Sequence, residues 1–564
     1  MTIQVSNSKP QWIRLGIEPI GAWLVIGHWD FVKNMSIPWF LSIFWFLALV
    51  SKTLYYLYLW QIKEYRFDRF FALFREPKGY ASVLTRPLIF ACCLFAASFI
   101  LPLKVTGVLF LLLYVGEVLL WAKSIVRQEA TIPVVTAKTF SLLLLSLASG
   151  GALFLLLLAG PLSPLQVLLV IDCMMLCVIS FWVMVEKPLT FLAKRQLVWK
   201  AQKKRKELSR LVAVGITGSF GKTSTKEFLA AILAHRFHLK TTLKHQNTEV
   251  GASRAILAMP ANTEVFVAEM AAYRKGDIAE ISSVVKPTVG ILTGIGSQHL
   301  ALFGSQQAIV ETKFELAAAL PEGGTLIVNA DSPLVKFKVQ SSKFKVTNQN
   351  LKLITYSLHD KDAHVHASDV NETLRGLGFT VHAALPGMRE AKETMHVNLL
   401  GRHSISNLLA ATACALCLGM NVGDIASAMS SLKAFPRTLE PKTGPNGSLV
   451  IDDTYNASYE GVMAALHVLS LAQGKKIVIL TSLIELGKNA LSAHRNLGEA
   501  LARVADQIIV TDRRHEKELK SRKTVFVTDA KKILEEIDRN RLKSNDVILL
   551  EGRIPQEVVR RLTR

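Results

Sequence analysis

Residues 215–223 read Gly-Ile-Thr-Gly-Ser-Phe-Gly-Lys-Thr, and this stretch decides the expected fold of the second half of the chain. The apolar, β-branched run Leu211–Ile216 predicts a buried strand, and Ser224–His235 has a helical pattern. A strand, a glycine loop, a lysine, a threonine and a helix bind phosphates, because backbone N–H groups and a helix N-terminus face the anion. The lysine reaches the outer phosphates and the threonine ligates Mg²⁺. The nucleotide-binding candidates are Thr217, Gly218, Ser219, Gly221, Lys222, Thr223 and Ser224.

The loop departs from the general phosphate-binding pattern at one position, so its surroundings have to support the interpretation. That pattern has a glycine five residues before Gly221, where this chain has Ile216. Downstream, Val265–Ala268 predicts a strand that ends in Glu269, a carboxylate well placed to bind Mg²⁺. Further strands at 289–293 and 325–331 alternate with a helix that carries residues 311–315. This order predicts a P-loop-type ATPase domain built on a parallel sheet.

The ordered series of motifs resembles the Mur ligases, the ATP-dependent amide-forming enzymes of peptidoglycan synthesis. It looks most like the MurF branch, which adds D-alanyl-D-alanine. The resemblance covers about residues 205–564, and it implies ATP and Mg²⁺ as cofactors. It also implies that Lys222, His299 and Lys313 are catalytic, with Lys313 carbamylated by CO₂ to become an acidic metal-site group.

The same resemblance assigns further residues. It places Thr223 and Glu269 on the first Mg²⁺, and His299 and the carbamate of Lys313 on a second. It implies that Asn407, Arg437 and Asp453 bind ATP, with Asn407 near the adenine and Arg437 at the interdomain hinge. The segment His245–Thr248 resembles the part of the family that contacts substrate. The expected substrate-binding residues are Asn247, Thr248, Tyr455 and Asn456.

The C-terminal part predicts a second α/β domain. Five strands alternate with helical patterns, which predicts a doubly wound, Rossmann-like parallel sheet. Two positions depart from the MurF pattern: Ser458-Tyr459 replaces Asn-Pro, and Glu551-Gly552-Arg553 replaces Lys-Gly-Ser. Both departures concern the incoming amine. The strands are expected at Ser448–Asp452, Lys476–Thr481, Gln507–Val510, Thr524–Val527 and Asp546–Leu550.

The first 190 residues predict a multi-span α-helical membrane domain, because a spanning helix needs roughly 20 mostly apolar residues. The sequence Gly-Pro-Leu-Ser-Pro at 160–164 divides one long apolar stretch into a helical hairpin. Trp12–Trp29 contains Arg14 and Glu18, so it either spans or lies in the interface. About five spans are expected, at Ile37–Trp60, Pro87–Leu103, Val105–Ala122, Thr139–Gly160 and Pro164–Val185.

Charge in the loops predicts the orientation of this domain. The loops Gln61–Arg86 and Lys123–Lys138 carry most of the basic residues, and the opposite loops carry only Lys104. The positive-inside rule therefore places these two loops, and everything after Lys187, in the cytoplasm, where ATP is available. Two acids, Glu117 and Asp172, lie inside predicted spans. They have either a function or a structural ion pair, with each other or with a basic residue near a helix end.

Composition narrows the remaining classes of function. The formal charge is +22, but zinc-finger, RNA-recognition and aromatic-interleaved basic motifs are absent from the sequence, so nucleic acid is not an expected partner. Anionic lipid headgroups and phosphorylated substrates account for the charge better. Of the six cysteines, Cys414 and Cys417 form a CxxC in an apolar helical pattern without a second pair. They are expected to be buried, reduced thiols.

These patterns predict four segments: a transmembrane domain at 1–193, a basic linker at 194–210, a central ATP-binding domain at 211–435 and a C-terminal domain at 436–564. The expected function is a ligase at the inner membrane that adds an amino acid or dipeptide to a carboxylate of a cell-wall precursor, presented on a membrane lipid. One alternative is ordinary MurF activity on a UDP-linked peptide, merely localised at the membrane. Another is a non-catalytic scaffold with a relic nucleotide site. The sequence leaves the oligomeric state open.

Overall fold

A computed structural model describes most of the chain, which divides into two compact units, Met1–Leu192 and Ala193–Arg564. Four predicted features lie outside the described residues: Trp12–Trp29, His245, His299 and Asn456. The structure describes residues 39–63, 65–75, 83–126, 130–243, 246–296, 303–341, 350–455, 457–483, 486 and 490–563.

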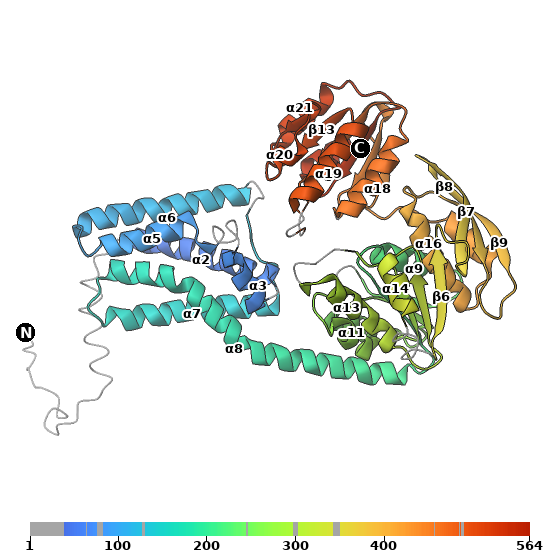
Figure 1. The fold of residues 1–564 in the computed structure, drawn as a ribbon. Helices are drawn as coiled ribbons and strands as arrows, with labels where there is room; N and C mark the ends of the chain where they lie inside the picture. Colours follow the sequence, from blue (N-terminus) through green and yellow to red (C-terminus); the bar gives the residue numbers. More distant parts are fainter. Residues whose placement is uncertain are drawn as a thin grey trace, which may run out of the picture. The chain divides into compact units, whose positions relative to one another are not determined.

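The first unit is a bundle of apolar helices (Figure 1). Among the described residues, four of its helices are long and apolar enough to cross a membrane. The short helix α3 (Phe67–Ala72) and the 3₁₀ turn η2 (Leu73–Arg75) follow the first of them. The four long helices are α2 (Trp39–Ile62), α6 (Leu103–Val126), α7 (Ala137–Leu158) and α8 (Pro164–Glu207).

The segment Pro87–Leu103 is not one continuous helix, so the predicted bounds of this helix are wrong, and the number of spans stays a prediction. Helix α5 (Arg86–Ala97) has 12 residues. It is therefore about 18 Å long, against about 30 Å for the hydrocarbon core of a bilayer. The backbone leaves the helix in a turn at Ser98–Leu101, and Pro102 precedes α6, so the chain reverses before α5 can lengthen.

Side-chain hydrogen bonds set the direction of each helix against α8. Residue numbers increase in both helices from one α2–α8 hydrogen bond to the next, so α2 and α8 run parallel. For α5 and for α7, the residue number increases in one helix of the pair while it decreases in α8, so both helices run antiparallel to α8. The bonds join Trp45 to Leu168 and Lys52 to Asp172 for α2, Ser98 to Gln166 and Cys92 to Cys173 for α5, and Ser141 to Glu186 and Ser149 to Trp182 for α7.

Helix α8 continues beyond the predicted span to Glu207, so most of the expected basic linker is helical. Its last turns belong to the second unit. Arg205 is buried and donates to the carbonyl oxygens of Val285 and Lys286, and Lys204 donates to those of Leu257 and Met259. Both side chains therefore satisfy carbonyl groups at the ends of neighbouring helices, which otherwise lack partners.

The second unit begins with a nine-stranded sheet in the order β2-β3-β1-β4-β5-β6-β7-β8-β9. Strands β2 to β7 are parallel, and β8 and β9 add an antiparallel extension at one edge. The expected parallel sheet is confirmed. The strands are β1 (Val212–Thr217), β2 (Leu239–Thr241), β3 (Val265–Glu269), β4 (Val289–Leu292), β5 (Thr325–Asn329), β6 (Lys352–Ser357), β7 (Val365–Thr373), β8 (Gly376–Ala383) and β9 (Ala391–Val397).

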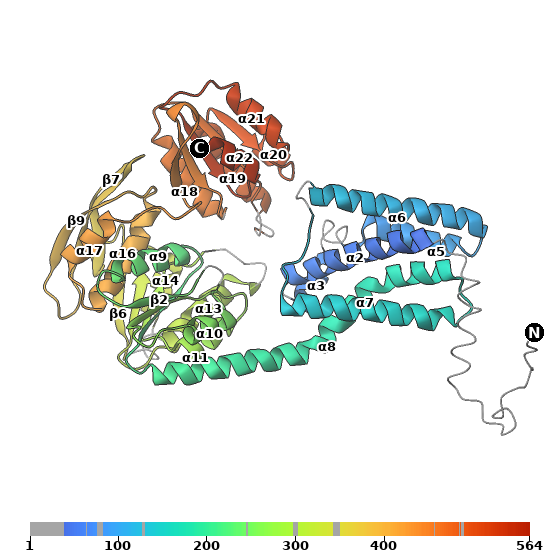
Figure 2. The same cartoon turned by 180° about the vertical axis from the view of Figure 1, so that it is seen from behind.

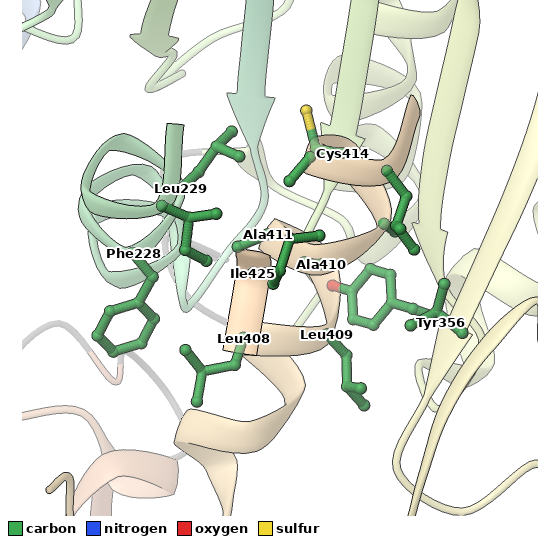
Figure 3. Close-up of a cluster of buried hydrophobic side chains, with 14 of the residues drawn as sticks. Phe228, Leu229, Tyr356, Leu408, Leu409, Ala410, Ala411, Cys414 and Ile425 are labelled. Atoms are coloured by element: carbon green, nitrogen blue, oxygen red, sulfur yellow. The ribbon is translucent and has the colours of Figure 1, made fainter. Parts of the chain in front are cut away.

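Helices cover both faces of this sheet (Figure 2). One face packs against α9 (Lys222–Leu233), α16 (His403–Cys417) and α17 (Val422–Ser430). In Figure 3, Ala410 and Ala411 of α16 lie beside Leu229 of α9, and their small side chains let the two helices approach closely. The other face packs against α10 (Glu249–Leu257), α11 (Asp277–Val285), α13 (Gln306–Ala318) and α14 (Pro333–Gln340).

A six-stranded sheet in the order β10-β11-β15-β12-β13-β14 follows, with β10 antiparallel at its edge and the other strands parallel. All five strands expected for the C-terminal part are present. The strands are β10 (Glu440–Thr443), β11 (Leu449–Asp453), β12 (Lys476–Leu480), β13 (Gln507–Val510), β14 (Thr524–Phe526) and β15 (Val547–Glu551). The helices are η3 (Pro445–Gly447), α18 (Tyr459–Ser470), α19 (Ala490–Val504), α20 (Glu516–Leu519), α21 (Ala530–Asp538) and α22 (Gln556–Leu562).

Candidate active site

The candidate phosphate-binding loop connects β1 to α9 at the centre of the large sheet. Gly221 caps the N-terminus of α9 with φ +76°, a left-handed conformation that glycine adopts without steric cost. A Cβ atom on Gly221 would lie 2.4 Å from Asn407 Oδ1, and one on Gly218 would lie 2.1 Å from Thr293 Oγ1. Only glycine therefore fits at either position. The first-turn N–H groups of α9 lie beside this loop, as anion binding requires.

A polar trio lies where β1, β3 and α9 meet. Glu269 is the last residue of β3 and pairs in register with Ile216 of β1. Thr223 Oγ1 donates to Glu269 Oε2 at 3.0 Å, and Asn247 Nδ2 donates to Glu269 Oε1 at 3.2 Å. A hydroxyl, a carboxylate and an amide are the oxygen ligands that Mg²⁺ prefers. The structure thus brings together three residues that the sequence proposed separately.

Two lysines lie near each other in this site. Lys222 turns back on its own loop, and its Nζ donates to the carbonyl oxygens of Gly218 (2.9 Å) and Ser219 (3.2 Å). Burial lowers the pKa of Lys222, and Glu269 opposes this shift. Lys313 of α13 is only 3% exposed; burial first and the charge of Lys222 second lower its pKa to about 7. Much of Lys313 is therefore a neutral amine at neutral pH.

Asn407 reaches the loop from α16. Its side chain is 9% exposed, and its Oδ1 accepts a hydrogen bond from Thr225 Oγ1 at 3.3 Å. The same oxygen occupies the space beside Gly221. Asn407 thus fixes the base of the loop against α16, and its predicted contact with the adenine stays a prediction.

Several other candidates have hydrogen bonds within the protein. The buried Thr217 hydroxyl donates to Met270 O at 2.8 Å, and Thr248 caps α10 by accepting from Gly251 N. The backbone N–H of Ser219 donates to Gly294 O, and the side chain of Ser219 is buried. The predicted binding roles of Thr217, Ser219, Ser224 and Thr248 stay predictions.

Arg437, the predicted hinge arginine, follows α17 in the chain. Arg437 has φ +66°, and its Nε donates to Thr454 Oγ1 at 2.8 Å while its Nη2 donates to Thr454 O at 3.0 Å. Its guanidinium therefore holds the turn after β11. Tyr455 lies in this turn and is 40% exposed; burial first, then the charges of Glu269 and Glu227, raise its pKa.

Asp453 and Glu551 form a buried acid pair at the ends of adjacent parallel strands, β11 and β15. Asp453 Oδ1 accepts from Leu439 N at 3.2 Å, whereas neither Glu551 side-chain oxygen has a donor among the other described residues. The two carboxyl groups lie at paired positions of adjacent strands, so a charge on one disfavours a charge on the other. Burial raises the pKa of Asp453 to about 7 and that of Glu551 well above its ordinary value.

Residues 216–415 match the Mur ligase middle domain, and residues 439–554 match the glutamate ligase domain of Mur ligases. Together the two matches span more than half of the chain. This chain belongs to the Mur ligase family. The family assignment made from the sequence is confirmed.

Individual Mur ligases resemble the chain over its second unit. UDP-N-acetylmuramoyl-tripeptide–D-alanyl-D-alanine ligase of Mycobacterium bovis is 31% identical over 302 residues, which are 52% of this chain and 57% of that protein. The enzyme of the same name from Synechocystis is 33% identical over 286 residues, which are 50% of this chain and 58% of that protein. The chain thus spans less than two thirds of these relatives. The crystal structure of MurF ligase from Thermotoga maritima with ADP superposes with a TM-score of 0.58 at 27% identity, covering 65% of this chain and 83% of that one.

Within this Mur ligase, two supporting residues were missed by the sequence reasoning. Thr293 follows β4, and its Oγ1 donates to Phe220 O at 2.5 Å inside the phosphate-binding loop. Lys226 is 1% exposed, and its Nζ donates to Thr242 O at 2.9 Å. Thr293 was detectable as a polar residue at the end of a predicted strand. Lys226 has no comparable signal, because in the sequence it resembles any lysine of a helix.

The second predicted metal position is described only in part. His299 and Asn456 lie outside the described residues, while Lys313 is described and buried. Over the described ranges, histidine, cysteine, aspartate and glutamate side chains do not gather in a group of three or more that could hold a metal. The trio at Glu269 stays a candidate magnesium site on the chemistry of its oxygen ligands.

Proposed function

We propose that this Mur ligase is an ATP-dependent amide ligase that forms ADP and phosphate through an acyl phosphate. Its substrates are a carboxylate of a cell-wall peptide precursor and the amine of an amino acid or dipeptide. The observation that carries the proposal is the contact of Thr223 and Asn247 with Glu269 beside the glycine loop. The left-handed Gly221 at the N-terminus of α9 fits a loop that binds a nucleotide phosphate, and the trio fits Mg²⁺.

Each residue has a separate task in this proposal. Bound Mg-ATP supplies the phosphoryl group that activates the carboxylate, and the metal neutralises phosphate charge. Thr223 and Glu269 hold the metal, and Lys222 contributes positive charge beside the phosphates. The remaining predicted ATP contacts are Thr217, Gly218, Ser219, Gly221, Ser224, Asn407, Arg437 and Asp453, and the predicted substrate contacts are Asn247, Thr248, Tyr455 and Asn456.

Lys313 is proposed to carry a carbamate. A neutral lysine amine attacks CO₂, so that an N–C bond forms and one proton leaves the nitrogen. A pKa of about 7 supplies the neutral amine near physiological pH. The product is anionic, and Lys222, whose charge lowers the pKa of Lys313, would then face an opposite charge. With His299, the carbamate would hold the second Mg²⁺.

The first unit is proposed to cross the cytoplasmic membrane, with the second unit in the cytoplasm. Large apolar side chains of α6 and α7 face outward from the bundle, including Leu112, Leu119, Leu155 and Leu156, each more than 60% exposed. Such exposed apolar area suits a lipid environment. We propose the limits 1–193 for the membrane domain, 194–210 for the linker, 211–435 for the ATP-binding domain and 436–564 for the C-terminal domain.

Two acceptor classes follow from this placement. The lead proposal is a precursor linked to a membrane lipid, because the membrane unit precedes the two matched Mur ligase domains. The similarity to UDP-N-acetylmuramoyl-tripeptide–D-alanyl-D-alanine ligases favours the second, a UDP-linked tripeptide that receives D-alanyl-D-alanine. Glu551 and Arg553, which replace the lysine and serine of the MurF pattern, favour a different amine.

A phosphate-release assay of the detergent-solubilised full chain tests these proposals. Lipid-linked and UDP-linked muropeptides are compared across a panel of amino acids and dipeptides. Phosphate release that needs both a lipid-linked acceptor and an amine supports the lead proposal, and activity confined to UDP-linked acceptors contradicts it. Lys222→Ala serves as the inactive control. A cellular function that survives Lys222→Ala would instead indicate a scaffold.

A further inference from the structure

Three charged side chains from three helices meet inside the membrane unit. Lys52 of α2 has its Nζ 2.9 Å from Glu117 Oε1 of α6 and 2.7 Å from Asp172 Oδ2 of α8. The side chains are 10%, 9% and 0% exposed, in that order. Both acids thus share one lysine that lies in the middle of a helix and not near its end. Neither the ligase proposal nor the family match gives this cluster a role.

Around the cluster, the part of the chain that the structure describes adds hydrogen-bond donors but no second ion-paired cation. Tyr114 Oη donates to Asp172 Oδ2 at 3.0 Å, and Lys52 Nζ lies 5.2 Å from the centre of the Tyr114 ring. Tyr56 of α2 donates to the carbonyl oxygen of Val83, at 3.4 Å. The other titratable groups on this side are the thiols of Cys173 and Cys92, whose sulfur atoms are 3.3 Å apart.

The charges of this cluster do not balance. One ammonium group faces two carboxylates, so the fully ionised cluster carries a net charge of −1. An uncompensated buried charge costs several kcal/mol, and more where the surroundings are hydrocarbon. In addition, Asp172 Oδ1 is buried and lacks a hydrogen-bond donor among the described residues. One bound proton removes the excess charge without displacing any side chain.

The geometry selects the acid that holds this proton. Asp172 accepts hydrogen bonds from both Lys52 and Tyr114, which stabilise its ionised form. Among the described residues, Lys52 is the one cation paired with Glu117, and it also pairs with Asp172. We propose that α2, α6 and α8 form a proton-binding site in which Glu117 carries an exchangeable proton while Lys52 and Asp172 stay ionised.

Infrared difference spectroscopy of the full chain in lipid nanodiscs tests this site. The carbonyl stretch of a protonated carboxyl group is separate from the carboxylate bands. The wild type is expected to show this band for Glu117 at neutral pH and to lose it as the pH is raised. Glu117→Gln should remove it. Asp172→Asn should also remove it, because Lys52 then neutralises an ionised Glu117.

Two further variants make the test specific. Lys52→Met leaves two carboxyl groups without a cation, so a second protonated band is expected. The exposed Glu499→Gln should leave the spectrum unchanged. Because burial also raises the pKa of Glu551, Glu551→Gln identifies any band from that carboxyl group separately. A spectrum in which Glu117→Gln changes no protonated band overturns the proposal, as does a band that disappears only when sodium is added. Ligation is not measured, so the outcome is independent of the proposed reaction.

Discussion

Replacing Lys313 by methionine should stabilise the second unit while abolishing ligation. The pKa of Lys313 falls from 10.5 to about 7 in the folded protein. Each pKa unit is worth about 1.4 kcal/mol, so charging Lys313 in the folded state costs about 5 kcal/mol. Methionine fills a similar volume without the amine and removes this cost. The gain is an upper limit, because the unfolded chain and local rearrangement reduce it.

The effect of pH on this variant has a definite sign. Between pH 7 and pH 10.5 the unfolded chain holds a proton on Lys313 that the folded chain does not. Stability of the wild type therefore rises with pH across this window, and the full penalty applies below it. The difference between Lys313→Met and the wild type should be greatest below pH 7 and vanish near pH 10.5.

Pulse proteolysis in urea measures the free energy of unfolding of the second unit in the detergent-solubilised full chain. Buffers free of CO₂ keep Lys313 as an amine. Lys226→Met is the matched control, because Lys226 is equally buried but bonds Thr242 O and pairs with Glu227 at 2.9 Å. The free energy of unfolding of Lys226→Met should be about 1–3 kcal/mol lower than that of the wild type, because these bonds are lost. Two results would refute the reasoning. One is a Lys313→Met protein that is less stable than the wild type at pH 6.5, and the other is a variant whose free energy of unfolding still rises with pH as in the wild type.

The remaining predictions concern the nucleotide loop, the metal and the acid pair. Gly221→Ala should weaken ATP binding about tenfold or more, because φ is +76° and the new Cβ meets Asn407. Gly276→Ala is the control, because Gly276 also has a left-handed φ (+94°) but lies in open space, and it should bind ATP normally. Removing Mg²⁺ with a chelator should stop ADP formation, and readdition should restore it. The raised pKa of Asp453 stabilises the protein in acid, a contribution lost as pH rises through about 7. Thermal unfolding of Asp453→Asn should lack that loss, and an unchanged pH profile would contradict the raised pKa of Asp453.

Much of the fold follows from local patterns in the sequence. Buried parallel strands are continuous apolar runs, so β1, β3, β4, β5 and the C-terminal strands were predicted within a few residues. Strands β7, β8 and β9 were not predicted, because they lie in a polar stretch without a continuous apolar run. Helix α5 was predicted too long, because hydropathy continues through Ser98–Leu101 although the backbone turns there. Composition alone cannot locate such a turn.

The site was predictable wherever a residue ends a strand or follows the glycine loop. Glu269 and Thr223 meet because parallel strands present their carboxyl ends at one edge of the sheet. Partners set by helix rotation were not predictable. Lys52 stands alone in an apolar helix, and its contacts with Glu117 and Asp172 depend on how three helices turn toward one another. The contacts of Arg437 with Thr454 likewise depend on tertiary structure.

The transfer of oxygen from acceptor to phosphate tests the proposed chemistry most directly. An acceptor with ¹⁸O in its carboxylate is incubated with the solubilised full chain, Mg-ATP and the amine. If the carboxylate attacks the γ-phosphorus and the amine later displaces phosphate, one labelled oxygen leaves with the phosphate. One ¹⁸O atom then appears in inorganic phosphate for each amide bond that forms. The account predicts this one-to-one transfer, and its absence from Lys222→Ala. Amide formation with unlabelled phosphate, or with AMP as the nucleotide product, would contradict it.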